Sequence, residues 1–238
     1  YFESGGQVSD SGCLVFNDVT YPIKKTIQMP NGAIGNVIEN AIKLNINDKI
    51  LLHVEKGFRD ASSKSHTAAH IVHASLRQVL GDTVSQAGSN VEPGRLRFDF
   101  SYSKKVSEED LNSIFELSNS IIFNDTSVKV KNMNIEDAKK EGALAFFGDK
   151  YGNEVRVVDI GDHSKELCGG THVHNTSNIG LVVLTNESSI GSNLRRVEML
   201  SGIKAFEFLI KAKNSFSYAA TLLGVQEEKV LNKLENVL

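Results

Sequence analysis

The residues best suited to chemistry are two short groups of histidine and cysteine. His66-Thr67-Ala68-Ala69-His70 has histidines at positions i and i+4, which share one face of a helix, so both imidazoles could reach one ion. Cys168-Gly169-Gly170-Thr171-His172 places a thiolate near an imidazole, and its glycines allow a tight turn. Nitrogen and sulfur donors of this kind suit tetrahedral zinc. We therefore predict that a Zn²⁺ ion is bound by His66, His70, Cys168 and His172.

Other histidines could replace one of these ligands. His73 lies on the same helical face as the first pair, and His163 and His174 flank the cysteine loop. Thr67 occupies the position at which a zinc peptidase helix carries a glutamate as general base. A peptidase mechanism would therefore lack its base.

The composition is that of a globular protein. The chain has 238 residues, of which 40% are hydrophobic and 23% charged, enough to bury at least one core. A formal net charge of −3 provides no overall field that attracts nucleic acid, so any RNA contact should be local. Two cysteines exclude a disulfide-rich secreted scaffold, and no apolar run approaches the roughly 18 residues of a membrane helix. We expect a cytoplasmic protein without a membrane partner, and we interpret the start at Tyr1 as that of a piece of a longer chain.

The elements that must position the ligands fall into three predicted parts. In residues 1–60, apolar runs at Cys13–Phe16, Ala33–Ile38 and Ile50–Val54 are separated by turn residues, including Pro30-Asn31-Gly32. This spacing favours a small β-barrel-like segment or a meander.

Residues 61–202 mix helices and strands. Apolar residues follow helical spacing over Ser63–Leu80, and Gly81 ends the pattern. Ser107 and Asp110 form a variant of the capping box and start a helix that ends near Phe123. A short helix is predicted from Asn134 to Gly142, and strands at Leu96–Phe100, Val128–Met133, Glu154–Ile160, Ile179–Thr185 and Leu194–Leu200. Without regular βαβ alternation, the pattern predicts an α+β fold.

Residues 203–238 are predicted to be helical. Ile203–Leu223 is amphipathic, Gly224 breaks it, and a second helix covers Gln226–Leu238. The helix either packs on its own domain or forms an arm leading to a further domain. The predicted fold is therefore α+β, with an N-terminal β-barrel-like segment, a central zinc-containing domain and a C-terminal helical segment.

Five separated motifs resemble, in order, those of the editing domain of alanyl-tRNA synthetase and its free-standing relatives. They are the glycine motif Glu3–Gln7, the first zinc motif His66–His70, the pair Gln86–Ser89 and Arg95–Phe100, the second zinc motif Leu167–Val173, and the strand motif Arg195–Glu198. The similarity runs from Tyr1 to about Gly202. The helical tail resembles the connector toward the C-terminal domain of that family.

The resemblance implies a zinc-dependent deacylase that hydrolyses the ester of seryl-tRNA(Ala), and of glycyl-tRNA(Ala) as well. An alanine pocket cannot strongly reject a side chain that lacks a methyl group or merely adds a hydroxyl, so a second site must supply the missing discrimination. The implied partners are the acceptor end of alanine tRNA and the aminoacylation and C-terminal domains, which this chain lacks.

The resemblance also implies roles for single residues. Gln86 would position the substrate, and Cys168 would take part in catalysis through the metal. Gly5 and Gly6 either bring backbone N–H groups close to the seryl group or simply form a turn. Ala69 stands where many relatives carry Thr, a candidate for reading the serine hydroxyl. Thr67 is the substitute we assign to substrate binding, although its position points away from the zinc-facing stripe.

Arginines are the candidates for RNA contact, because the guanidinium group pairs well with phosphate. The candidates are Arg95, Arg97, Arg195 and Arg196. Because strand residues alternate, some of them could instead only solvate an exposed face.

Two rival functions stay open at this point. The editing domain of threonyl-tRNA synthetase resembles the chain in both zinc patterns, although the glycine motif and the Arg195–Glu198 strand favour the alanyl branch. A zinc-stabilised RNA-binding module without catalysis is the second rival, because four protein ligands would fill a tetrahedral shell.

Overall fold

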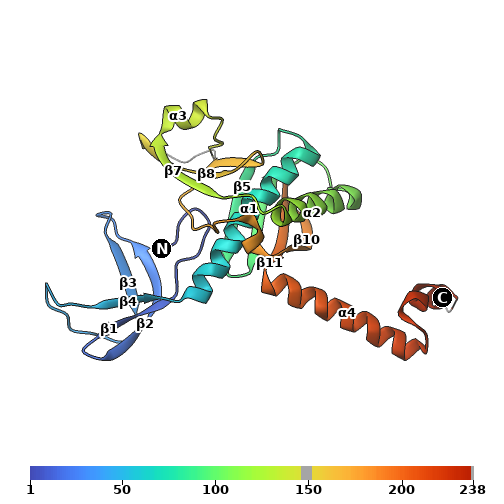
Figure 1. The fold of residues 1–238 in the computed structure, drawn as a ribbon, viewed down its shortest axis with the longest axis horizontal. Coiled ribbons are helices and arrows are strands. Elements are labelled where there is room, and N and C mark those ends of the chain that lie inside the picture. The colour runs from blue at the N-terminus through green and yellow to red at the C-terminus, as the bar shows by residue number, and fades with distance from the viewer. Residues whose placement is uncertain (146–151, 237–238) are drawn as a thin grey trace.

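The computed structural model describes residues 1–145 and 152–236 and has an α+β architecture built from antiparallel sheets (Figure 1). The N-terminal sheet has the order β3-β2-β1-β4, formed by β1 (Gly12–Phe16), β2 (Val19–Gln28), β3 (Ile34–Ile38) and β4 (Leu51–Val54). In the described residues β3 and β4 are edge strands that do not pair with each other, so the sheet is open. The barrel-like closure stays a prediction.

Strand β2 was not predicted from the sequence. Most of its side chains are exposed, so the apolar alternation that marks a half-buried strand is missing, and Pro22 interrupts it. The strand forms because β1 and β3 pair with it on both sides.

The central part packs two helices on a four-stranded sheet. Helices α1 (Lys56–Leu80) and α2 (Glu108–Phe123) accompany a sheet of order β10-β11-β6-β5, made of β5 (Gln86–Glu92), β6 (Arg95–Ser101), β10 (Val182–Gly191) and β11 (Leu194–Ser201). Ile71 and Leu76 of α1 are completely buried in one core with Phe98 and Phe100 of β6. Ser107 caps α2 by accepting from the Asp110 N–H, which confirms the predicted start of that helix.

Helix α1 begins at Lys56, seven residues before the predicted start at Ser63. Apart from the buried Ser62, the residues before Ser63 are exposed or half-buried, so no apolar stripe marks them in the sequence. Gly81 ends the helix as predicted, and its N–H bonds to the carbonyl of Arg77. The result is one long helix that joins the N-terminal sheet to the central core.

A third, smaller sheet holds the cysteine loop. It has the order β7-β8-β9, formed by β7 (Lys129–Asn134), β8 (Glu154–Ile160) and β9 (Ser164–Leu167), with helix α3 (Ile135–Lys140) packed on it. Val158 and Ile160 of β8 reach the main core. Strand β9 ends at Leu167, which pairs with Val157 of β8. Cys168 is the next residue, so the pairing of these strands sets the position of the start of the cysteine loop. The short helix η1 (Thr176–Ile179) stands where the predicted strand Ile179–Thr185 begins, so that strand starts later, at Val182.

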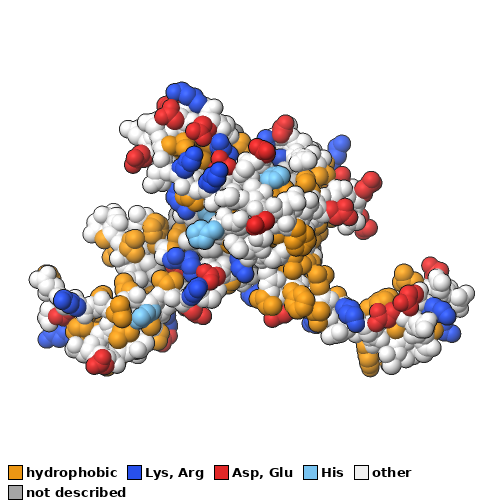
Figure 2. Space-filling view, in the orientation of Figure 1, with side chains coloured by type: hydrophobic (Ala, Val, Ile, Leu, Met, Phe, Trp, Pro, Cys, Tyr) orange, Lys and Arg blue, Asp and Glu red, His pale blue; other side chains and the backbone are white. Residues whose placement is uncertain are grey.

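The C-terminal helix α4 (Ile203–Leu223) has the predicted bounds and extends away from the central part (Figure 1). It is followed by η2 (Glu227–Lys229) and α5 (Val230–Glu235), which pack back on it. Large apolar side chains stay exposed along α4, including those of Phe206, Tyr218 and Leu222 (Figure 2). Among the described helices, none has both the length and the apolar character needed to cross a membrane.

We expect the Leu76→Ala substitution to lower the free energy of unfolding by about 2–5 kcal/mol, because it opens a cavity in the main core. Leu222 provides a matched control, since its side chain is 69% exposed whereas Leu76 is completely buried. Leu222→Ala should change the free energy of unfolding by no more than about 0.5 kcal/mol. Urea unfolding monitored by circular dichroism measures both, and equal effects would contradict the assignment of the core.

Candidate metal centre

The four predicted ligands lie together between helix α1 and the loop that follows β9. One donor atom from each of His66, His70, Cys168 and His172 lies within 4.8 Å of the others. The two helical histidines are buried, and the two loop residues are half-buried. The alternative ligands considered from the sequence, His73, His163 and His174, are not part of this cluster.

The orientation of His66 is fixed by Gln7, a completely buried residue of the N-terminal segment. Gln7 Oε1 accepts from the Thr171 N–H at 3.0 Å and lies 2.7 Å from His66 Nδ1. Because a backbone N–H can only donate, the atom facing it is the amide oxygen, and His66 Nδ1 must therefore carry its proton. Gln7 Nε2 also donates to Thr171 Oγ1, so one side chain joins three segments of the chain.

The other two imidazoles are held in the same tautomer. His70 Nδ1 donates to Glu166 Oε2 at 2.7 Å. The Thr67 hydroxyl donates its proton to the Ser63 carbonyl, so it can only accept from His172 Nδ1 at 3.2 Å.

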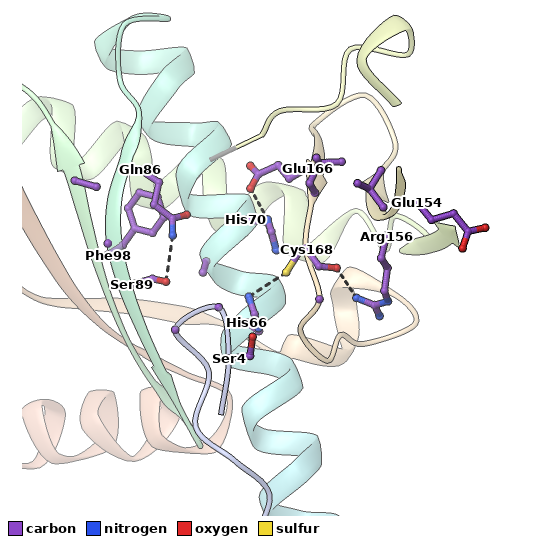
Figure 3. Close-up of a pocket in the computed structure, with 18 residues that line it drawn as sticks. Ser4, His66, His70, Gln86, Ser89, Phe98, Glu154, Arg156, Glu166 and Cys168 are labelled. Atoms are coloured by element: carbon purple, nitrogen blue, oxygen red, sulfur yellow. Dashed lines mark hydrogen bonds and ion pairs between the residues drawn. The ribbon is translucent and has the colours of Figure 1, made fainter. Parts of the chain in front are cut away.

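This outer layer directs the Nε2 lone pairs of all three rings toward one point. Nε2 of His66 lies 3.4 Å from Cys168 Sγ (Figure 3). Nε2 of His70 and of His172 are buried, and in the described part of the chain they have no hydrogen-bond partner other than the Cys168 thiol. Imidazoles that donate from Nδ1 and leave Nε2 free are the usual arrangement around a protein-bound metal.

The electrostatics of the centre favour a cation. Burial alone would lower the pKa of His70, but the negative charges of Glu166 and Cys168 raise it to about 10. Burial opposes ionisation of the Cys168 thiol, yet His66 and His70 lower its pKa well below the usual range. Burial lowers the pKa of His172 to about 3, so that ring is neutral. The thiolate of Cys168 and the buried carboxylate of Glu166 therefore place two negative charges beside the imidazoles, and they favour positive charge there, as a proton on His70 or as a bound metal ion.

Two glycines are required because neighbouring residues approach their backbone too closely for a side chain to fit. A Cβ on Gly170 would lie 2.1 Å from Cε1 of His66, so a side chain there would displace a ligand. Gly6 has a φ of +79°, and a Cβ on it would lie 2.7 Å from the carbonyl oxygen of Ser89. The glycine motif therefore packs its backbone directly against β5, beside the centre.

Three of the four ligands, His66, His70 and Cys168, line a cavity of about 620 Å³ between α1, β5, β8 and the N-terminal segment, whereas His172 does not reach its wall. Gly5, Gly6 and Gln86, all predicted to contact substrate, line this cavity, as does Ala69. Gln86 Nε2 donates to Ser89 Oγ at 3.2 Å. Thr67, also predicted to contact substrate, does not line the cavity. It is completely buried behind His172, so its hydroxyl is used to hold a ligand instead.

The four arginines predicted to bind RNA lie outside this cavity, and each faces a carboxylate. Arg195 forms a two-point ion pair with Glu187, and Arg196 forms one with Asp99. The pairing of β6 with β11 also brings Arg95 to 3.0 Å from Glu198, and Arg97 lies 3.8 Å from Asp99. Their contact with RNA stays a prediction, because these carboxylates compete with phosphate for the same donors.

Three residues of the centre were missed from the sequence. Gln7 was seen only as the last residue of the glycine motif, and its partners lie 59 and 164 positions away. Glu166, two residues before Cys168, is a buried acid that also accepts from His73 Nδ1 at 2.9 Å. Arg156 interrupts the apolar strand β8 and donates to the carbonyls of Cys168 and Gly170. The charge of Arg156 amid apolar neighbours was the available signal, whereas Glu166 follows Ser164 and Lys165 and has no such contrast.

The sequence is similar to that of known proteins. Residues 155–198 match the family described as the threonyl and alanyl tRNA synthetase second additional domain. The chain is 38% identical over 238 residues to the alanine--tRNA ligase of Thermoanaerobacter sp. (strain X514), a match that covers 100% of the chain and 27% of the relative. It is 40% identical to the corresponding enzymes of Lysinibacillus sphaericus (strain C3-41), over 99% of the chain and 26% of the relative, and of Listeria monocytogenes serotype 4b (strain F2365), over 100% and 27%.

The segment that carries β8, β9, the cysteine loop and most of β11 thus matches a domain described from both threonyl and alanyl tRNA synthetases. Over its whole length, the chain is homologous to a segment of the alanine--tRNA ligases, which confirms the resemblance predicted from the five motifs. The chain spans about a quarter of the length of these relatives.

We expect Gln7→Leu to weaken divalent metal binding by about 10- to 100-fold, the usual loss when the partner that orients a ligand is removed. Leucine keeps the size of the side chain but leaves the Nδ1–H of His66 without an acceptor. Gln7→Glu keeps an acceptor and should retain most of the affinity. Titration with Zn²⁺ in competition with a chromogenic chelator measures the dissociation constants of the parent chain and of the two variants.

Ser118→Ala is the control for general destabilisation, because Ser118 is completely buried and bonds to Ser75 away from the ligands. This variant should bind Zn²⁺ as the parent chain does. If Gln7→Leu binds the metal equally well, Gln7 has no orienting role.

Proposed function

We propose that the chain binds zinc through His66, His70, Cys168 and His172 and hydrolyses the ester that joins serine to alanine tRNA, with the glycyl ester as a second substrate. The main support is the convergence of four nitrogen and sulfur donors, three of which lie on the wall of a cavity of about 620 Å³. Cavities of this size are typical of small-molecule sites, which range from about 300 to 1,000 Å³.

The donor set fits zinc. Bonds of about 2.0–2.3 Å in a tetrahedron place neighbouring ligand atoms roughly 3.3–3.8 Å apart. The four atoms lie within 4.8 Å of one another, so small side-chain movements would complete the shell. The free Nε2 atoms and the lowered pKa of Cys168 add support, because zinc takes neutral imidazole and thiolate ligands.

Residues that line the cavity would bind and orient the substrate. When bound, zinc supplies Lewis-acid chemistry that polarises a carbonyl oxygen or activates water. Gln86 has both an amide donor and an amide acceptor on the cavity wall, opposite the ligands in Figure 3, where it would orient the aminoacyl group. Gly5 and Gly6 bring main-chain atoms to the same wall, where a larger side chain would fill the space.

The least strongly held imidazole is the one to give way if coordination must change during the reaction. The acceptors of Nδ1 differ: a carboxylate at 2.7 Å for His70, an amide at 2.7 Å for His66, and a hydroxyl at 3.2 Å for His172. A carboxylate partner raises the basicity of an imidazole ligand most. His172 is therefore the ligand we expect to exchange most easily.

The proposal extends to the whole protein of which the chain would form a part. We propose three units at 1–60, 61–202 and 203–238, with the first completing a barrel-like domain. The RNA partner is the acceptor end of alanine tRNA, and charging would be carried out by an aminoacylation domain elsewhere in a cytoplasmic ligase. The threonyl-type alternative is disfavoured by the alanine--tRNA ligases that match the whole chain.

We expect Cys168→Ala to lower serine release from seryl-tRNA(Ala) by more than about 100-fold, because a lost metal ligand should cost more than a lost outer partner. Bound zinc should fall with it, and treatment of the parent chain with a chelator should reproduce both losses. Released serine and metal content are measured on the same samples.

Cys13→Ala is the matched control, since Cys13 is the other cysteine, half-buried in β1 outside the cluster. It should leave both readouts unchanged, and alanyl-tRNA(Ala) should stay intact with every variant. Full activity in Cys168→Ala would remove the thiolate from the mechanism. A zinc-bound parent chain that hydrolyses neither seryl nor glycyl esters would favour the RNA-binding module.

A further inference from the structure

Arg156 is fixed in place on the wall of the cavity. It projects from β8, is half-buried, and lines the same cavity as His66, His70 and Cys168. Its Nη1 donates to the carbonyl oxygen of Cys168 at 2.7 Å (Figure 3) and to that of Gly170 at 2.8 Å. Both contacts are to the loop that carries the thiolate ligand, so the guanidinium plane is held beside the centre.

The other edge of this guanidinium group is available for a ligand. An arginine has five N–H donors, and the Nε and Nη2 donors of Arg156 have no hydrogen-bond partner in the described ranges 1–145 and 152–236. These atoms are also not among the buried atoms without a partner, so they remain accessible. No carboxylate lies within 4.0 Å of Arg156 in the same ranges, in contrast to the four arginines of β6 and β11.

Resting on the proposed function, we propose that Arg156 binds the phosphodiester group that precedes the esterified terminal nucleoside of the RNA. In such a substrate the amino group of serine is cationic and the ester is neutral, so the phosphodiester is the anion nearest the reacting bond. The planar fork of arginine donors matches two phosphate oxygens. The acidic neighbour on the same strand, Glu154, extends away from the ligands in Figure 3.

The size of the cavity supports the same assignment. A volume of about 620 Å³ is more than an aminoacyl group fills, and the remainder is suited to the attached nucleoside. With the ester carbonyl at the metal ligands and the nucleoside in the cavity, the chain of the RNA must leave along the wall. Arg156 is the arginine on that wall, adjacent to Cys168.

Two substrates separate contact with phosphate from contact with the ester. One is adenosine carrying serine on its ribose, which has no phosphate, and the other is a seryl acceptor-stem RNA that ends in the same nucleoside. With the 238-residue chain, Arg156→Gln should lower kcat/KM for the RNA by about 10- to 100-fold, mainly through KM, as expected for a lost charge-assisted bond. Hydrolysis of the seryl-adenosine reports only the lost bonds to the Cys168 and Gly170 carbonyls, so its loss in Arg156→Gln should be at least about tenfold smaller than the loss for the RNA.

Salt dependence provides a second readout. The slope of log KM against log salt for the RNA should fall by about 0.7–0.9 in Arg156→Gln, the change for one lost phosphate contact. Arg156→Lys, which keeps the charge, should retain most of that slope.

Arg77→Gln is the matched control, because Arg77 also uses Nη1 to bond two backbone carbonyls, of Asp82 and Val84, and does not line this cavity. It should behave as the parent chain with both substrates. Equal losses on both substrates, or loss of bound zinc in Arg156→Gln, would show that Arg156 only holds the loop or acts at the ester, and would overturn the proposal. A parent chain that cleaves neither substrate would overturn the proposed function itself, and this proposal with it.

Discussion

The centre depends on three hydrogen bonds that hold imidazole Nδ1 atoms in a buried environment. Gln7, Glu166 and Thr67 each accept one proton, and each acceptor role is imposed by a further bond or charge of the same residue. Since the three partners come from different segments, the Nε2 atoms converge only when the whole central part is folded. The chemistry of the cluster is therefore a property of the tertiary structure, although the ligand types are visible in the sequence.

These polar groups lie at one end of an apolar core, and the core stabilises the helix that carries two of the imidazoles. Along α1, the buried apolar residues Ile71 and Leu76 continue the helix beyond His70, and they pack on β6 and α2. The rigid helix sets the spacing of the two histidines, whereas the cysteine loop is set by β9 and by Arg156. Burial raises the cost of an unpaired polar atom, so a set of imidazoles left with free Nε2 atoms is costly unless a ligand satisfies them.

Much of this arrangement could be predicted from the sequence, and the failures have a common cause. The bounds of α4, the cap of α2 at Ser107 and the stop of α1 at Gly81 follow from local patterns and are confirmed. The ligands could be found because two local spacings were each informative. Gln7, Glu166 and Arg156 were missed because their roles depend on partners distant in sequence. The carboxylates that face Arg195 and Arg196 were overlooked for the same reason, since Glu187 and Asp99 lie on strands paired with β11.

The N-terminal segment packs against the central part of the chain, although the N-terminal sheet separates the two in the sequence. Residues 1–7 precede the N-terminal sheet, yet Gln7 pairs with Val91 of β5 and its side chain reaches His66 and Thr171. The sheet that follows exposes large apolar side chains, such as Leu51 and Leu52, and contributes little to the main core. The glycine motif therefore belongs structurally to the metal centre, although in the sequence it precedes the N-terminal sheet.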